Sequence, residues 1–388
     1  MKYCNFSYEY LYLDTYEGNV MICPWMEPSQ CSIGNILEND IEEIWKGEKA
    51  EYFRNLFREG CYKFCRLEGC PRIQNHSLDE INDEEEYKKI TQTPERPKYI
   101  NLAYDFVCNQ HCETCRNEVF KPPLDYKEKV ETIRKKISPY IETAEELSAS
   151  GHGDPFASPY MMSLLENLKP KNPNLKFMLE TNGVFLDEEH WARIEHLKDF
   201  YIRLCVTSNS FDEFTYNHIS RGGNFKKLMH NLEFIKTLRE KNYINETIST
   251  FVVQDRNFRE IPSFIDRSLN EFGFDKVLLR PVYQWGTMPE EVFWFKDVLN
   301  PLHPYHKEYL EILQHPALKD SRVYNFGGDT MHPCREYPAK QQQNVECIYE
   351  SKSEISTSRK AFAHIITSFI PGKKTRKKVR EKILNGAK

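Results

Sequence analysis

Apolar and polar residues change their spacing repeatedly along the middle of the chain. Six short apolar runs, rich in β-branched and aromatic residues, predict strands at 98–106, 144–150, 175–181, 200–208, 247–254 and 276–283. Between these runs, apolar residues recur at helical spacing near 126–140, 159–168, 187–198, 224–241 and 258–272. Strands that alternate with amphipathic helices are typical of parallel βαβ units. The pattern therefore predicts an α/β fold with a partial (β/α)6 TIM-like barrel, and an open doubly wound sheet fits the same periodicity.

The chain before the barrel has a different pattern. The stretch YLYLDTYEGNVMICPW predicts a β-hairpin with its turn at Tyr16, Glu17 and Gly18. A helix-rich stretch follows, with an expected core face of Ile41, Ile44, Trp45, Phe53, Leu56 and Phe57. Charged residues and two closing prolines then indicate a linker. We expect a small cysteine-rich domain at 1–75, the linker at 76–97, the barrel at 98–290, an extension at 291–350 and a basic tail at 351–388.

Composition narrows the class of protein. The chain has 388 residues, 40% of them apolar and 13% aromatic, which is typical of a packed globular protein. The net charge of −5 argues against general nucleic-acid binding, because no basic field is available to neutralise phosphates. No signal peptide or membrane-spanning run is visible, so we expect a cytoplasmic protein. In that reducing compartment the twelve cysteines are expected to bind metal and not to form disulfides.

Three cysteines follow the first barrel strand at the spacing Cys108-x3-Cys112-x2-Cys115. Loops at the C-terminal ends of barrel strands carry the chemistry of such folds. Thiolates are soft ligands that suit iron–sulfur clusters or zinc, and a structural zinc ion needs a fourth protein ligand. His111 lies inside the loop at an awkward position for that role. The spacing favours a 4Fe–4S cluster with one iron left open, and a zinc knuckle is the alternative.

At this point the sequence resembles the radical S-adenosylmethionine (SAM) superfamily, whose signature is C-x3-C-x2-C after the first strand of a partial barrel. Further motifs follow in the family's order over about residues 98–290: SGHGDPFASP, then TNG, then a run ending in RGG. The resemblance implies that these segments bind SAM, through Gly151, Gly153, Asp154, Pro155, Thr181, Asn182, Thr207 and Arg221. Glycines let main-chain atoms approach a ligand closely, and an arginine fork suits a carboxylate. Thr114 replaces the aromatic residue that many members carry before the last cysteine, so the adenine contacts are expected elsewhere.

This resemblance also implies a reaction. Family members bind SAM at the open iron and cleave it with one electron to a 5′-deoxyadenosyl radical, which abstracts a hydrogen atom from the substrate. A reducing partner such as flavodoxin or ferredoxin is therefore expected.

The N-terminal cysteines resemble a SPASM/twitch auxiliary domain, which in most members follows the barrel and here precedes it. The resemblance implies at least one auxiliary 4Fe–4S cluster, with Cys4, Cys23, Cys65 and Cys70 as ligands. A second cluster would draw on Cys31, Cys61, Cys334 and Cys347. A plain zinc ribbon is the alternative for this module.

The substrate is the least specified part. Cys205 shares a strand face with Thr207, which makes it a candidate hydrogen-atom donor or an ordinary buried residue. The short segment before Cys4 and the basic tail lead us to expect a carbohydrate or nucleotide-linked sugar, modified by epimerisation or oxidation. The tail itself is either a peripheral contact with the inner membrane face or a solvated end. Alternatives are a peptide or protein maturase, among which auxiliary clusters of this type are common, and a non-catalytic iron–sulfur or zinc protein that binds or transfers electrons.

Overall fold

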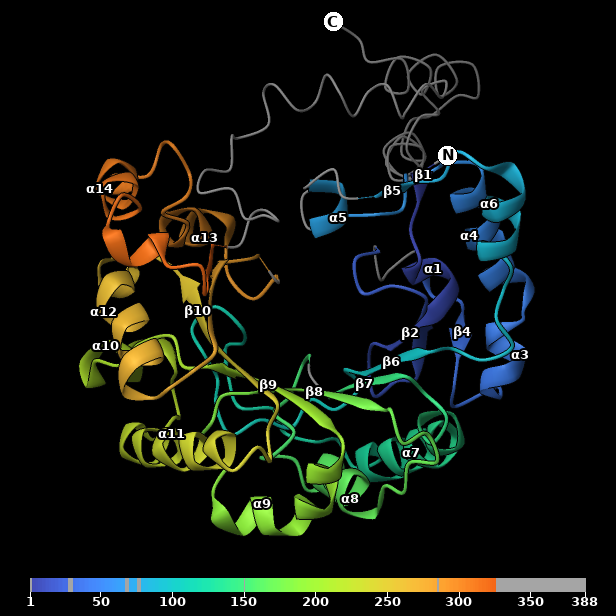
Figure 1. The fold of residues 1–388 in the computed structure, drawn as a ribbon, viewed down its shortest axis with the longest axis horizontal. Coiled ribbons are helices and arrows are strands. Elements are labelled where there is room, and N and C mark those ends of the chain that lie inside the picture. The colour runs from blue at the N-terminus through green and yellow to red at the C-terminus, as the bar shows by residue number, and fades with distance from the viewer. Residues whose placement is uncertain are drawn as a thin grey trace, which may run out of the picture. The chain divides into compact units, whose positions relative to one another are not determined.

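The computed structural model describes residues 2–26, 31–66, 70–74, 78–149, 151–284 and 286–325. Within them, one sheet has the strand order β12-β11-β10-β9-β8-β7-β6-β2-β3-β4 (Figure 1). Its six central strands match the six predicted ones and are all parallel: β6 (Tyr99–Leu102), β7 (Glu146–Ala149), β8 (Lys176–Thr181), β9 (Tyr201–Thr207), β10 (Glu246–Val253) and β11 (Lys276–Pro281). Each strand lies beside its predecessor in the chain, without the reversal that defines a doubly wound sheet. The partial barrel is thereby confirmed.

Helices cover the outer face of the curved sheet (Figure 1). They are α7 (Tyr126–Ile141), α8 (Pro159–Asn167), α9 (Glu188–Ile194), α10 (Glu213–Ile219), α11 (Phe225–Glu240) and α12 (Ile261–Asp266). Short turns of 3-10 helix add η1 (Glu195–Asp199), η2 (Phe258–Glu260) and η4 (Pro316–Lys319), and η3 (Arg267–Glu271) is a π-helical turn. Apolar residues at helical spacing explain the packing: α7 buries Val130, Ile133, Ile137 and Ile141 against the sheet. Only α10 was not predicted among these helices.

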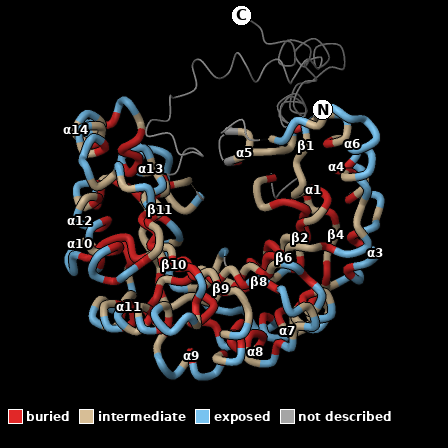
Figure 2. The backbone as a smooth tube through the Cα atoms, viewed as in Figure 1, coloured by how far each residue is buried: buried red, intermediate tan, exposed pale blue. Residues whose placement is uncertain are grey.

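The two faces of the barrel sheet differ sharply in chemistry. On the outer face, Phe177 and Leu179 of β8 and Leu279 of β11 are at most 1% exposed. Buried stretches, drawn red, run along the sheet (Figure 2). The intervening residues point to the concave face, where the side chains of Glu180 and Arg280 are each 32% exposed. Side chains alternate along a strand, so one face forms the core and the other remains open to solvent. The concave face is therefore the polar surface on which a substrate can be held.

The predicted hairpin near the N-terminus is confirmed as β2 (Tyr10–Leu13) and β3 (Asn19–Met21), paired antiparallel. Gly18 in its turn has φ of +89°, a backbone conformation that favours glycine. The remaining elements of this module are β1 (Lys2–Tyr3), α1 (Phe6–Glu9), β4 (Gly34–Asn35), α3 (Ile41–Trp45), α4 (Glu48–Arg58) and α5 (Pro71–Gln74). Strand β2 also pairs in parallel with β6. The module and the barrel thus share one sheet, which the local pattern did not reveal.

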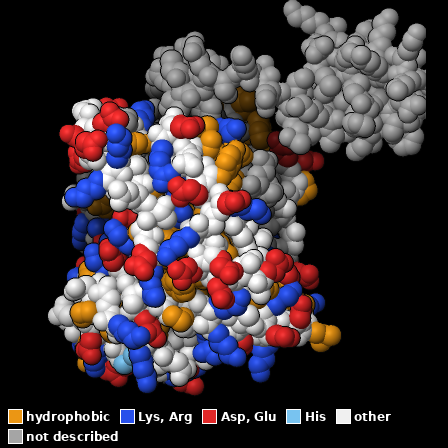
Figure 3. All heavy atoms as spheres, turned by 90° about the vertical axis from the view of Figure 1, so that its right-hand side faces the viewer, with side chains coloured by type: hydrophobic (Ala, Val, Ile, Leu, Met, Phe, Trp, Pro, Cys, Tyr) orange, Lys and Arg blue, Asp and Glu red, His pale blue; other side chains and the backbone are white. Residues whose placement is uncertain are grey.

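The expected core face of this module is buried, apart from Leu56, which is half-buried. Arg54 is fully buried among these residues, donates to the main-chain oxygens of Ser7 and Trp45, and lies 4.3 Å over the Trp45 ring. The segment predicted as a linker contains β5 (Asp79–Glu80), which pairs with β1, and α6 (Glu84–Ile90). Acidic and basic side chains intermingle on the face of the molecule formed by this module (Figure 3).

Beyond the barrel the structure describes α13 (Glu290–Lys296), α14 (His306–Ile312) and β12 (Val323–Asn325), which pairs in parallel with β11. Cys334, Cys347 and the basic tail at 351–388 lie outside the described residues. No helix in the described ranges is long and apolar enough to cross a membrane.

Candidate functional site

The three cysteines of the predicted cluster loop lie at the C-terminal end of β6. Burial raises the pKa of Cys108 and of Cys112 to about 12, and the nearby Cys115 thiol contributes to both shifts. Metal binding displaces such protons, because the thiolate is the ligand. Within the described chain, no three His, Cys, Asp or Glu side chains are grouped to hold a single metal ion.

Polar groups contact the sulfur atoms of this loop. The Gln110 main-chain N–H donates to Cys108 Sγ at 3.5 Å, and the Asn182 amide donates to the same sulfur at 3.8 Å. The Cys112 thiol donates to Gln110 Oε1 at 3.1 Å. Hydrogen bonds to sulfur are one of the means by which proteins tune iron–sulfur clusters. The residues present therefore fit the group that the motif implies.

The glycine turn after β7 holds the cluster loop from one side. The Asp154 N–H donates to Val107 O at 2.9 Å. A Cβ at Gly153 would lie 2.4 Å from Asp105 O and 2.6 Å from Val107 O, so only glycine allows this approach. Arg116 closes the same contact by donating to the main-chain oxygens of Phe106 and His152.

Asp154 joins this turn to the TNG segment. Its buried carboxylate accepts from the N–H groups of Phe156 (3.0 Å) and Ala157 (3.1 Å), from the Thr181 hydroxyl (2.8 Å) and from the Asn182 N–H (2.8 Å). Burial raises the pKa of Asp154, and these donors oppose the shift. The carboxylate is fully engaged by the chain itself. Asp154 therefore joins the glycine turn to the TNG segment, and a ligand would be bound by main-chain atoms of the turn.

The RGG segment after α10 holds the loop from a second side. The His111 N–H donates to Arg221 O at 2.9 Å, and the Glu113 N–H donates to Ile219 O at 2.8 Å. A Cβ at Gly223 would lie 2.4 Å from the hydroxyl of Tyr216 and 2.9 Å from Gln110 Nε2. The glycines thus permit close packing of this segment on the cysteine loop.

The N-terminal hairpin holds the loop from a third side. Asp14, which follows β2, lies 3.3 Å from His152 of the glycine turn. The Tyr16 ring packs against Phe106 at 5.3 Å and against Tyr126 at 4.9 Å. Sequence reasoning missed these contacts, because they depend on the pairing of β2 with β6.

Several buried polar atoms around the loop have no hydrogen-bond partner among the described residues. They are Asn109 Nδ2, His111 Nδ1, Arg221 Nε, Ser208 Oγ, Thr250 Oγ1 and both amide atoms of Gln254. Native proteins rarely leave so many buried groups unpaired, so each requires a partner. Thr207 pairs in register with Thr250, which brings the fourth and fifth strands into the same group. Asn109, His111 and Arg221 belong to the cysteine loop and the RGG segment, and the other three residues lie in the C-terminal halves of β9 and β10 or just beyond them, at the end where barrels place their chemistry.

The four predicted auxiliary ligands all belong to the N-terminal module. Burial raises the pKa of Cys23 well above its usual range, and the thiols of Cys4, Cys65 and Cys70 contribute to the shift. The Trp25 N–H donates to Cys23 Sγ at 3.4 Å. Thiols are soft ligands of the kind that hold iron–sulfur clusters, and the assignment of these four as ligands stays a prediction.

Two further cysteines approach the same place. Burial raises the pKa of Cys65, and Cys31 and Cys61 are among the thiols that add to the shift. Their predicted partners for a second cluster, Cys334 and Cys347, lie outside the described residues, so that cluster stays a prediction.

Cys205 lies on the concave face, next to a charged pair. Arg280 of β11 donates to Glu180 of β8 at 2.6 Å, and Glu180 is in register with Cys205 of β9. Burial raises the pKa of Cys205 to about 12, and Glu180 adds to the shift while Arg280 opposes it. The side chain therefore stays a neutral thiol. Arg280 Nε is buried without a hydrogen-bond partner in the described structure.

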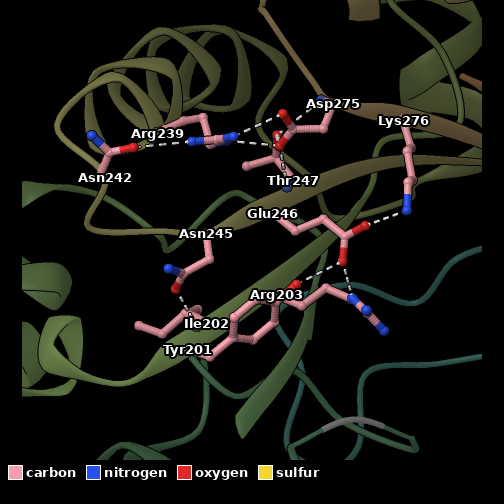
Figure 4. A network of polar contacts seen from close by, with 10 residues as sticks. All are labelled: Tyr201, Ile202, Arg203, Arg239, Asn242, Asn245, Glu246, Thr247, Asp275 and Lys276. Carbon is pink, nitrogen blue, oxygen red and sulfur yellow. Dashed lines mark hydrogen bonds and ion pairs between the residues drawn. The ribbon is translucent and has the colours of Figure 1, made fainter.

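A second charged network lies at the opposite, N-terminal end of the strands (Figure 4). The Glu246 carboxylate accepts from Arg203, from Lys276 at 2.5 Å and from the Tyr201 hydroxyl at 3.2 Å. Arg239 of α11 binds Asp275 at 2.8 Å beside it. Polar residues at this end of a barrel stabilise the fold and are distant from its chemistry.

Comparisons with known proteins give two family matches. Residues 106–267 match the Radical SAM superfamily, and residues 4–71 match the SPASM iron–sulfur cluster-binding domain. No curated protein matches the sequence.

Three solved structures illustrate the similarity in fold. Streptococcus suis SuiB bound to SAM is 13% identical, with a TM-score of 0.36, and the match covers 70% of this chain and 62% of that one. The anSMEcpe enzyme with AdoMet and the Cp18Cys peptide is 17% identical, with a TM-score of 0.34 and coverage of 47% and 50%. Methylornithine synthase (PylB) is 14% identical, with a TM-score of 0.36 and coverage of 51% and 57%. The chain therefore spans less than two thirds of each of them.

The family matches and the geometry agree on the cofactors, namely a 4Fe–4S cluster with SAM in the barrel and auxiliary iron–sulfur in the N-terminal module. Residues 106–267 are therefore a radical SAM domain, and residues 4–71 ahead of it are a SPASM domain.

Proposed function

We propose that this protein is a radical SAM enzyme that modifies a peptide on the concave face of its barrel. The observation that carries the proposal is the cysteine loop at the end of β6, which three neighbouring segments hold and in which Asn109 and His111 have buried polar atoms without a partner among the described residues. Bound together, the cluster and SAM supply a 5′-deoxyadenosyl radical by one-electron cleavage of the sulfonium.

The surrounding residues would orient SAM. Arg221 Nε is buried without a hydrogen-bond partner among the described residues, and the arginine is suited to meet the methionyl carboxylate. The glycine turn at 151–155 offers main-chain atoms to the amino group, with Asp154 as the residue that fixes the turn. The main-chain N–H of Asn182 is held by Asp154. Its side-chain amide donates to the sulfur of Cys108 and, at 2.8 Å, to Asn109 Oδ1. Thr181 and Thr207 complete this edge of the site.

The concave face supports a peptide as substrate. Arg280 Nε is buried and has no hydrogen-bond partner among the described residues, and its ion-pair partner Glu180 places a carboxylate acceptor beside it. That pair is complementary to the C=O and N–H of a peptide group. The SPASM domain favours the same substrate class, because auxiliary clusters of this type are common among peptide and protein maturases. The expectation of a sugar rested on the start of the chain and on the tail, which lies outside the described residues.

We further propose that Cys205 returns a hydrogen atom to the substrate. The substrate carbon radical takes the hydrogen atom from the thiol, which forms a C–H bond and leaves a thiyl radical. The thiyl radical then takes up one electron from the reducing partner, a ferredoxin or flavodoxin, and one proton. The raised pKa of Cys205 supports this role, because only the protonated thiol carries the hydrogen atom.

Two measurements test these proposals. Reconstituted protein is given SAM and reductant with pools of peptides or of nucleotide sugars, and 5′-deoxyadenosine is measured against the substrate-free rate. Stimulation by peptides is expected, and stimulation by nucleotide sugars alone would overturn the peptide proposal. In D2O, wild-type enzyme should place deuterium on the substrate carbon, whereas C205A should form 5′-deoxyadenosine without that label. A C205A product labelled like the wild type removes Cys205 from the mechanism.

A further inference from the structure

A buried lysine from the segment after the barrel contacts the cysteine loop. Lys296, the last residue of α13, is 5% exposed, and its ammonium lies 2.8 Å from Glu113 Oε1. Glu113 stands between Cys112 and Cys115 in the sequence of the loop. Lys296 therefore reaches the loop from outside the range 106–267 that the radical SAM family matches.

The charges around this contact are balanced. Lys296 also lies 3.1 Å from Asp255 Oδ1, and Arg256 lies 3.5 Å from Glu113 Oε2. The side chains of Glu113 and Asp255 are 20% and 11% exposed, whereas that of Arg256 is 45% exposed. The Asp255 N–H donates to Lys296 O at 3.0 Å, so main chain as well as side chain joins α13 to the end of β10. Lys296 is thus the buried cation of a cluster with two carboxylates.

Such a cation influences both geometry and charge. A buried ammonium that loses its partners is costly, so Lys296 and Glu113 hold each other in place. A fixed positive charge also favours an electron added nearby, because the local dielectric is low. Net charge and hydrogen bonding around an iron–sulfur cluster are among the factors that set its reduction potential.

We propose that Lys296 is a positioning residue that, through Glu113, fixes the cysteine loop and raises the reduction potential of the cluster bound there. This role concerns only the cluster and its loop and is independent of the peptide substrate and of Cys205. The segment after the barrel, which contains Lys296, is accordingly part of the radical-generating site.

The test is a redox titration of the reconstituted full-length protein, followed by EPR. The signal that changes on addition of SAM identifies the barrel cluster, and iron per chain is measured for every variant. K296M removes the cation, E113Q removes one carboxylate, and K296M/E113Q removes both charges. K307M is the matched control, because Lys307 is an exposed lysine of the same segment.

The two single variants are expected to shift the midpoint potential of the barrel cluster in opposite directions. K296M should move the midpoint to a more negative potential, E113Q should move it to a more positive one, and the double variant should lie between them. K307M should match the wild type. A structural role alone would shift both single variants in the same direction or leave both unchanged, and either result overturns the proposal.

If a variant fails to bind the barrel cluster, a comparison with K296R still tests the proposal. If K296M lacks the iron of the barrel cluster, K296R keeps the charge and should restore both iron and midpoint. E113Q at the wild-type potential with full iron content would then overturn the proposal. All readouts precede substrate turnover, so a failed peptide assay has no bearing on them.

Discussion

Replacing Asp154 with alanine tests how the SAM-binding edge is assembled. The substitution removes an acceptor used by four donors at 2.8 to 3.1 Å, two of them on the TNG segment. A hydrogen bond to a charged group contributes about 1.5–3 kcal/mol, and a buried donor left unpaired costs about 1–3 kcal/mol. Removal also relieves the burial penalty that raises the pKa of this carboxyl group. We expect a net loss of about 3–5 kcal/mol, concentrated between the two loops.

The functional result follows from Asn182, whose amide donates to Cys108 Sγ. Once the main-chain N–H of Asn182 is released from Asp154, the TNG segment loses its bond to the glycine turn, and apart from Cys108 the side chain is held by Asn109 and the Val184 N–H. Groups that orient ligands of a metal site are typically worth about 10–100-fold in affinity or activity. D154A should therefore lower the rate of reductive SAM cleavage by about 10–100-fold, measured as 5′-deoxyadenosine per cluster.

The control is D199A, which removes an exposed carboxylate from the surface turn after α9. D154N should be intermediate, because its amide oxygen still accepts while its NH2 group faces the Asn182 N–H. D154A with wild-type iron content, thermal midpoint and cleavage rate would contradict the proposed role of Asp154.

Three further outcomes are expected. G153A should impair cluster loading, measured as iron per chain, because the new methyl group meets Val107 O at 2.6 Å; retained iron would contradict this. C112A should abolish SAM cleavage, whereas C65A should keep substrate-free cleavage yet lose product formation; equal behaviour of the two would contradict separate clusters. E246Q should lower the free energy of unfolding, measured with urea, by about 2 kcal/mol. This is less than for a fully buried ion pair, because the side chains of Arg203 and Lys276 are 36% and 38% exposed to solvent. The pKa of Glu246 is lowered, so its contribution is complete above the ordinary carboxyl pKa and is lost only as pH falls through the lowered value. The difference in unfolding free energy between wild type and E246Q should therefore be constant from about pH 6 to 8. A change within that range would contradict the ion pairing of Glu246.

Local pattern was sufficient for the barrel. In β8 the alternation of Phe177 and Leu179 with Met178 and Glu180 gives both the strand and its faces. Pairing of β2 with β6 could not be obtained in this way, because the run at Tyr10–Leu13 suits a separate antiparallel module equally well. Strand pairing between distant segments is decided by packing and leaves no local signal.

The site shows the same division. The spacing of Cys108, Cys112 and Cys115 predicted the loop, since ligand spacing is local. The contact of Lys296 with Glu113 was missed, because the sequence around Lys296 has the pattern of an ordinary helix end. Gln254 was visible as a polar residue at the end of a predicted strand, which is the position where barrel chemistry occurs. Only the fold showed that its buried amide lacks a partner among the described residues.

The shared sheet bears on how this protein folds during its synthesis. Strand β2 is synthesised before β6 and presents an unpaired edge until Tyr99–Leu102 has been translated. We expect the auxiliary module to offer this edge to the first barrel strand as it emerges, because domains generally fold in order from the N-terminus during synthesis. A barrel expressed without residues 1–75 would expose the β6 edge, which is a site for aggregation. We therefore expect the barrel to need the N-terminal module for soluble expression.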